Sequence, residues 1–214
     1  MRTFILSLHT ISKRDYFLLY ALLNIAGLYL LYGITLEPAA FVGGHPKTIR
    51  FYNIFTTVMY FISPLYEFAK IYVIAKVIQK GINRTLKIES DLKMIFLIVL
   101  TAQFSMIFAD IVKSLWIMVI QPDMHMHHEK HFFPMSLYSF LGGGDSFHYR
   151  WKHLLRIINA FEILYWFILT IGISTVFKIS KKTGFMIVLR TYGVLLFAML
   201  ALRFLFNLIL SGFY

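Results

Sequence analysis

Five long apolar segments constrain this chain more than any other feature of its sequence. They cover about 16–35, 51–79, 94–121, 154–177 and 184–213. A helix needs about 20 apolar residues to cross a bilayer. The mean hydropathy is +0.71 and only 14% of the 214 residues are charged, which is outside the usual range of soluble proteins. The sequence therefore predicts an all-α integral membrane protein, a bundle of five transmembrane helices that forms a single membrane domain over residues 1–214.

The distribution of basic residues predicts the orientation of this bundle. Lysine and arginine gather before the first apolar segment and in the connections at 80–93 and 178–182, whereas 36–50 and 122–153 carry few for their length. The positive-inside rule then places the N-terminus in the cytoplasm and the C-terminus outside, so that 122–153 is an outer loop. Residues 1–14 are expected to lie on the cytoplasmic surface as an interfacial segment. Attraction to anionic lipids accounts for the net charge of +11 without nucleic acid.

Four of the five segments carry charged or amide side chains at positions that would meet hydrocarbon. Each such charge costs at least about 2.5 kcal/mol, so these side chains must face one another or water. Glu67 and Lys70 are three residues apart on one helix and can pair. Glu162 is expected to be a counter-ion for Arg203 or Lys113. The predicted intramembrane polar network consists of Glu67, Lys70, Gln103, Asp110, Lys113, Asn159, Glu162, Arg203 and Asn207.

This network has two principal interpretations. It is either a fully paired polar core that orients the helices or a water-lined path or binding cavity for an ion or a polar head group. Pairing with charges on a partner protein is a third. Pro64 lies one turn before Glu67 and removes a backbone donor, which predicts a kink in the second segment that would allow movement.

The outer loop contains the histidine-rich stretch "QPDMHMHHEKHFF" and then the apolar "PMSLYSFL", which is expected to form a short interfacial helix. Imidazole suits zinc, copper and nickel. The array is local, however, and it contains no HExxH helix. The sequence therefore favours incidental, low-affinity metal binding over a designed site, and it predicts no cofactor. The candidate metal ligands are His125, His127, His128 and His131.

No motif for catalysis stands out in the sequence. It has no GxSxG, no glycine-rich phosphate loop with a lysine and no cysteine, and Asp110 is the one clearly intramembrane aspartate. An intramembrane enzyme is therefore the least favoured class. The sequence predicts a non-enzymatic accessory or structural subunit of a larger membrane assembly, whose partners are other membrane proteins or further copies of itself. The alternative is a small transporter or channel that uses the charged layer.

The stretch "LLRIINAFEILYWFILTIGISTVFKISKKTGFMIVLRTYGVLLF" at 154–197 resembles the C-terminal half of the Ypt-interacting-protein (Yip) family. Relatives with a long cytoplasmic N-terminal region act in vesicle trafficking and contact Rab GTPases. This chain lacks that region, so the resemblance implies the short bacterial form, located in the inner membrane, with a transport-linked function. The positions that carry the resemblance are Asn159, Phe161, Trp166, Gly172, Ser174, Lys178, Ser180 and Lys181.

The expected pairing of Glu162 with Arg203 can be tested by thermal unfolding in detergent. Glu162→Gln and Arg203→Gln should each lower the melting temperature, because each change leaves a buried charge without its counter-ion. Reversing both charges in one chain should recover part of the loss. If the double reversal recovered nothing, the pairing would be wrong.

Overall fold

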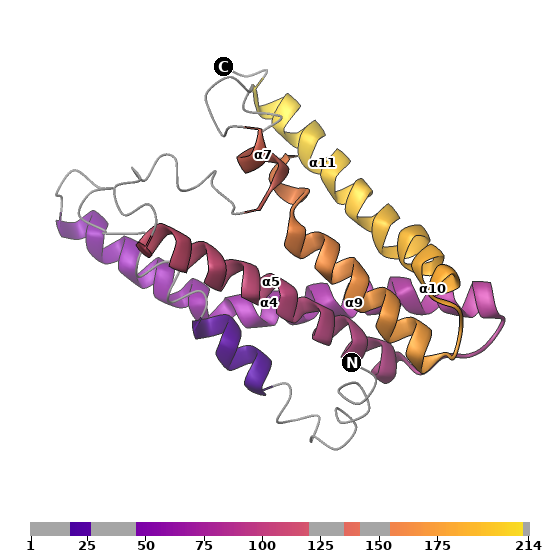
Figure 1. Ribbon diagram of the computed structural model, residues 1–214. Helices are drawn as coiled ribbons and strands as arrows, with labels where there is room; N and C mark the ends of the chain where they lie inside the picture. The colour runs from indigo at the N-terminus through magenta and orange to yellow at the C-terminus, as the bar shows by residue number, and fades with distance from the viewer. Residues whose placement is uncertain (1–17, 27–45, 120–134, 142–154, 212–214) are drawn as a thin grey trace. The chain divides into compact units, whose positions relative to one another are not determined.

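The structure is a computed structural model that describes residues 18–26, 46–119, 135–141 and 155–211. These ranges are mostly helical and contain no β-strand (Figure 1). The last helix is continuous but passes through a π-helical turn, in which the hydrogen bonds run from residue i to i+5. The elements are α4 (Pro46–Leu86), α5 (Leu92–Val119), α7 (Leu137–Phe140), α9 (Ala160–Val176), α10 (Lys181–Val188), the π-helical turn (Leu189–Gly193) and α11 (Val194–Ser211).

The all-helical fold predicted from the sequence is confirmed over the described ranges. Two helical stretches there, Leu92–Trp116 and Lys181–Leu202, are long and apolar enough to cross a membrane, and Ala160–Val176 is apolar but shorter. The count of five spans and the orientation of the termini stay predictions. Of the first predicted span the structure describes 18–26, which is helical. The interfacial segment 1–14 and the four histidines of the outer loop lie outside the described residues.

The chain forms two compact units. The first unit comprises Met1–Lys70 and Met106–Lys130, and the second comprises Ile71–Ser105 and His131–Tyr214. The first unit therefore contains the N-terminal part of α4 and the C-terminal part of α5. Pro64 lies inside α4, and the helix continues through it, so the expected kink stays a prediction.

The fourth predicted span differs from the structure at its start. The sequence predicts a helix from 154, but the structure has one helical turn at 155–157, then two non-helical residues, and α9 begins at Ala160. Two backbone hydrogen bonds explain the break: Leu137 N–H donates to the Ile158 carbonyl at 2.8 Å, and Ala160 N–H donates to the Met135 carbonyl at 3.1 Å. Residues 135–137, at the start of α7, thus pair with residues 158–160, at the start of α9, through an isolated antiparallel bridge. The expected short helix in this loop is present as α7.

A tight turn joins α9 to α10 in the second unit. Lys178 adopts a left-handed conformation with φ of 52°, and Ile179 N–H donates to the Ser174 carbonyl at 3.1 Å. This 6→1 bond is typical of a Schellman motif, which satisfies carbonyls at the end of a helix. Ser180 then caps α10 by accepting from Thr183 N–H at 3.1 Å. The two helices therefore reverse direction within four residues, 177–180.

Glycines allow the helices of the second unit to pack closely. An added Cβ on Gly172 of α9 would lie 2.6 Å from the side chain of Ile98 on α5. One on Gly184 of α10 would overlap the Ser174 hydroxyl of α9. Small residues at helix contacts let backbones approach in the way that membrane helices commonly use.

The contact of Gly81 with the last helix yields a testable prediction. An added Cβ on Gly81 would overlap Cγ2 of Thr191, whereas its other neighbours stay at 3.5 Å or more. Gly81→Ala should therefore destabilise the protein by about 1–3 kcal/mol through overpacking. Thr191→Ser removes Cγ2 but keeps the hydroxyl, so the double variant should regain most of the loss in a thermal-unfolding assay. A double variant no more stable than Gly81→Ala would contradict this contact.

Candidate functional site

The first unit contains an ion pair that the residue spacing predicts. Lys70 Nζ lies 2.5 Å from Glu67 Oε2, and the two residues are one turn apart on α4. The side chains of Lys70 and Glu67 are 29% and 17% exposed. The pair is therefore shielded from solvent over most of its surface.

Asp110 of α5 extends this pair into a larger acid–base cluster. It is half-buried and interacts electrostatically with Lys113, Glu67 and Lys70. Tyr20 is fully buried and lies within electrostatic range of both carboxylates. Two acids thus face two bases, so the formal charges of the cluster sum to zero. We call Tyr20, Glu67, Lys70, Asp110 and Lys113 the acid–base cluster.

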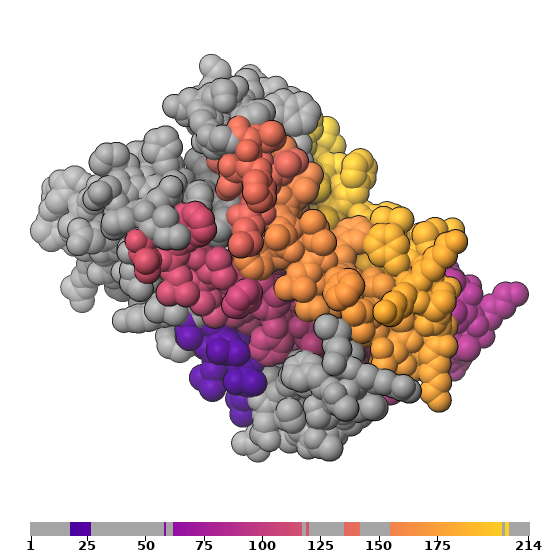
Figure 2. All heavy atoms as spheres, in the orientation of Figure 1, coloured from indigo at the N-terminus to yellow at the C-terminus, as the bar shows by residue number. Residues whose placement is uncertain are grey.

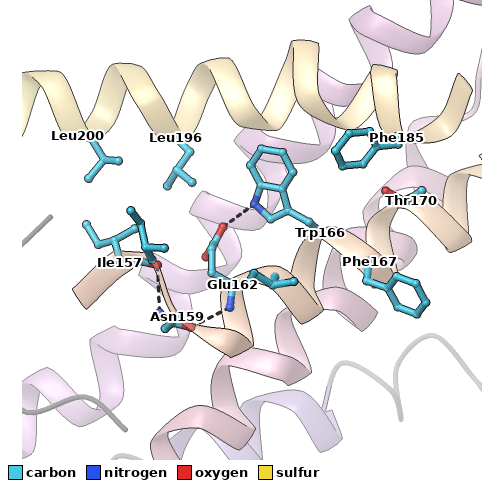
Figure 3. A pocket seen from close by; sticks show the side chains of 11 residues that line it. Ile157, Asn159, Glu162, Trp166, Phe167, Thr170, Phe185, Leu196 and Leu200 are labelled. Carbon is cyan, nitrogen blue, oxygen red and sulfur yellow. Dashed lines mark hydrogen bonds between the residues drawn. The ribbon is translucent and has the colours of Figure 1, made fainter. Parts of the chain in front are cut away.

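Glu162 of α9 belongs to the second unit and accepts two side-chain hydrogen bonds. The indole N–H of Trp166 donates to Glu162 Oε1 at 2.8 Å (Figure 3). The hydroxyl of Tyr192 donates to the same oxygen, also at 2.8 Å. Trp166 is one turn along α9, whereas Tyr192 comes from the π-helical turn of the last helix. One carboxylate oxygen therefore joins two helices through neutral donors.

Aromatic packing surrounds this carboxylate. The rings of Tyr165 and Tyr192 are 4.8 Å apart, and Trp166 meets Tyr192 edge-on at 5.7 Å. Gly193 lies against Trp166, since an added Cβ there would be 2.8 Å from the indole ring. The hydrogen bonds and the ring contacts thus hold the same turn against α9.

Asn159 positions Glu162. Its side-chain oxygen accepts from Glu162 N–H at 2.8 Å, which makes Asn159 the N-cap of α9. Its side-chain nitrogen lies 3.1 Å from the carbonyls of Arg156 and Ile157. The sequence assigns Asn159 to the polar network, but the structure shows its amide engaged with the backbone. It thereby fixes the first turn of α9, where Glu162 lies.

A cavity of about 430 Å³ opens beside Glu162 in the second unit (Figure 3). Its walls are almost entirely carbon. The Thr170 hydroxyl is buried and has no hydrogen-bond partner in the part of the chain that the structure describes. Such a cavity can hold an apolar chain or side chain. Its lining includes Glu162, Ile163, Trp166 and Thr170 of α9, Phe185 of α10, and Leu196 and Leu200 of α11.

The structure brings together only some residues of the predicted intramembrane polar network. Four of its charged residues meet in the acid–base cluster, and Gln103 is buried in the second unit. Arg203 and Asn207 lie in α11, but their side chains are outside the described residues. The pairing of Glu162 with Arg203 thus stays a prediction. Among the described residues no group of three histidine, aspartate or glutamate side chains could hold a metal ion.

Sequence reasoning missed Trp166 and Tyr192 as the partners of Glu162. The pattern N-x-x-E at 159–162 is a helix-start signal that could have placed the beginning of α9. The spacing of four between Glu162 and Trp166 could have indicated their contact. Tyr192 could not be found in this way, because its position depends on the π-helical turn.

Comparison of the chain with protein-family models, with curated proteins and with solved structures finds no match. The resemblance to the Yip family therefore stays a prediction.

The ion pair in the acid–base cluster predicts a charge-specific effect on stability. Lys70→Met should destabilise the protein by about 1–3 kcal/mol, because Glu67 loses its cation while still largely buried. Lys70→Arg should be close to neutral. Lys76→Met is the control, since Lys76 is exposed on the same helix and should change stability by less than about 0.5 kcal/mol. Equal losses for the two Met variants, measured by thermal unfolding, would count against the pair.

Proposed function

We propose that this protein is a non-enzymatic subunit of a larger assembly in a bacterial inner membrane and binds its partner through α11. The supporting observation is that α11 exposes a broad apolar face. In the most apolar window of Lys181–Leu202 only 22% of the residues are buried, compared with 50% for Leu92–Trp116. The last helix is therefore the membrane-compatible helix that the described chain covers least.

Most exposed residues of α11 lie on one side of the helix, and Met199, which is 49% exposed, lies beside that side. Phe197 is 74% exposed and Leu202 is 67% exposed. At about 100° per residue, this side is opposite to Leu196 and Leu200, which line the cavity. The outward face of α11 consists of Val194, Phe197, Ala198, Ala201, Leu202 and Leu205.

The shape of this face suits another transmembrane helix. Lipid tails are as apolar as leucine, so membrane helices associate by close packing at small residues rather than by hydrophobicity alone. Ala198 and Ala201 lie near the centre of the outward face, and Val194, Phe197 and Leu205 surround them. A partner helix can approach the two alanines closely while its side chains pack between the larger ones.

Transport is the second candidate function, and the acid–base cluster is the observation that favours it. Glu67 and Asp110 are like charges within electrostatic range of each other, and Glu67 follows Pro64 by three residues on α4. Paired intramembrane acids and bases often mark ion or proton paths. Flux across liposomes that is lost in Asp110→Asn without unfolding would favour transport over a subunit role.

The partner-binding face can be mapped by photo-cross-linking in the native membrane. A photoreactive residue placed at successive positions from 194 to 205 should join one protein of defined mass with a period of three to four residues. We expect strong products at Val194, Phe197 and Ala201 and weak products at Leu196 and Leu200. Leu65, which is 73% exposed on α4, is the control and should give none.

A binding assay complements the map. Ala201→Trp should reduce the co-purified partner by at least about tenfold, because a large side chain prevents close approach. Leu65→Trp should not. Cross-links without helical periodicity, or joined only to lipid or to a second copy, would refute the proposed subunit role.

A further inference from the structure

The π-helical turn at Leu189–Gly193 determines which side of α11 faces α9. A π turn accommodates one residue more than an α turn. Every residue after it is therefore rotated by about 100° from the position it would have in an uninterrupted α-helix. The cavity-lining and outward faces of α11 both lie after this turn, so both depend on its presence.

We propose that Tyr192 is a positioning residue whose hydrogen bond to Glu162 holds the π-helical turn and so sets the rotational register of α11. The bond joins the start of α9 to the middle of the last helix, residues that are 30 apart in sequence. The register itself is a property of this chain alone. Only its consequence for partner binding rests on the proposed function.

Neighbouring residues of the turn are fixed at the same time by different helices. Thr191 packs on Gly81 of α4, and Gly193 packs against Trp166 of α9. Tyr192, between them, donates to Glu162. Because successive residues of this turn contact two different helices, α4 and α9, the last helix resists rotation about its axis. Of these contacts, the Tyr192–Glu162 hydrogen bond is the one that a single substitution, Tyr192→Phe, removes with little loss of side-chain volume.

A side-chain hydrogen bond also reduces the free-energy cost of the π-helical turn. An irregular turn leaves carbonyl oxygens without their usual N–H partners, which is unfavourable in apolar surroundings. The Thr191 hydroxyl donates to the Ile187 carbonyl at 2.6 Å and lies 3.4 Å from the Val188 carbonyl. A side-chain donor thus satisfies the backbone at the turn. The turn is therefore stable enough to hold a register yet depends on a bond from outside the helix.

Loss of the turn would have a defined geometric result. In an uninterrupted α-helix each residue of α11 would take the place now held by the next one. Leu195 would replace Leu196 in the cavity wall, and Leu196 would move to the place of Phe197 on the outward face. The cavity lining and the partner-binding face would change together.

Cysteine cross-linking can read this register, because the chain contains no cysteine. Ile163 on α9 lines the cavity together with Leu196. Two double-cysteine variants are compared, one with Ile163→Cys and Leu196→Cys and one with Ile163→Cys and Leu195→Cys. A short bifunctional thiol reagent should cross-link the first variant at a higher rate than the second. In Tyr192→Phe the ratio of the two rates should fall by about tenfold or more, as expected for loss of one hydrogen bond to a charged group.

Matched variants separate the hydrogen bond from other causes. Tyr165→Phe removes a hydroxyl from the adjacent ring but leaves the Tyr192–Glu162 bond, so it should keep the wild-type ratio. Glu162→Gln retains an acceptor oxygen and should keep the register whatever it does to stability. Glu162→Leu should behave like Tyr192→Phe. An unchanged ratio in both Tyr192→Phe and Glu162→Leu would overturn the proposal.

A deletion tests the same idea if the single variants fold poorly. Removing Leu189 from the Tyr192→Phe chain should return α11 to its original register, because one residue fewer before α11 offsets the one-residue shift that follows loss of the π turn. The preference for Leu196→Cys should then reappear. Continued preference for Leu195→Cys would also overturn the proposal. These cross-links form within one chain, so their outcome does not depend on whether a partner exists.

Discussion

The Glu162 carboxylate needs hydrogen-bond donors among apolar helices, and the second unit is built around this requirement. Trp166 and Tyr192 supply two donors to one of its oxygens. Asn159 holds the backbone at Glu162 by capping α9. Buried polar groups are costly when unsatisfied and add specificity when satisfied. The position of α9, the π-helical turn and the rotation of α11 can all be related to this one group.

Glu162 is less anomalous in a bilayer than its apolar neighbours suggest. Lys178 is exposed in the turn after α9, where basic residues suit a membrane surface. Glu162 is 16 residues earlier, or about 24 Å away along a helix, compared with about 30 Å of hydrocarbon. If α9 spans a bilayer as the sequence predicts, with Lys178 at one surface, Glu162 lies close to the other. Tyr192 and Trp166 are residue types that favour such interfacial positions.

The spacing of residues along one helix predicted the Glu67–Lys70 contact but could not predict the contact between Glu162 and Tyr192. The contact of Glu67 with Lys70 follows from one turn of a regular helix, and the structure contains it. The contact of Glu162 with Tyr192 depends on an extra residue in the last helix and on the Schellman turn that reverses the chain. The helical class followed in the same way from five apolar segments. The start of α9 did not, because the pairing of 158–160 with a loop ends the helix there.

The two faces of α11 are linked by geometry. Leu196 and Leu200 fill one side, and the outward face lies opposite, so a rotation that changes one must change the other. The cavity is lined almost entirely by carbon, so its apolar contacts fix no orientation by themselves. The polar contact of Tyr192 must then select among rotations that apolar packing alone would leave similar in free energy. A single, partly buried hydrogen bond can in this way specify which surface a largely apolar helix presents to its neighbours.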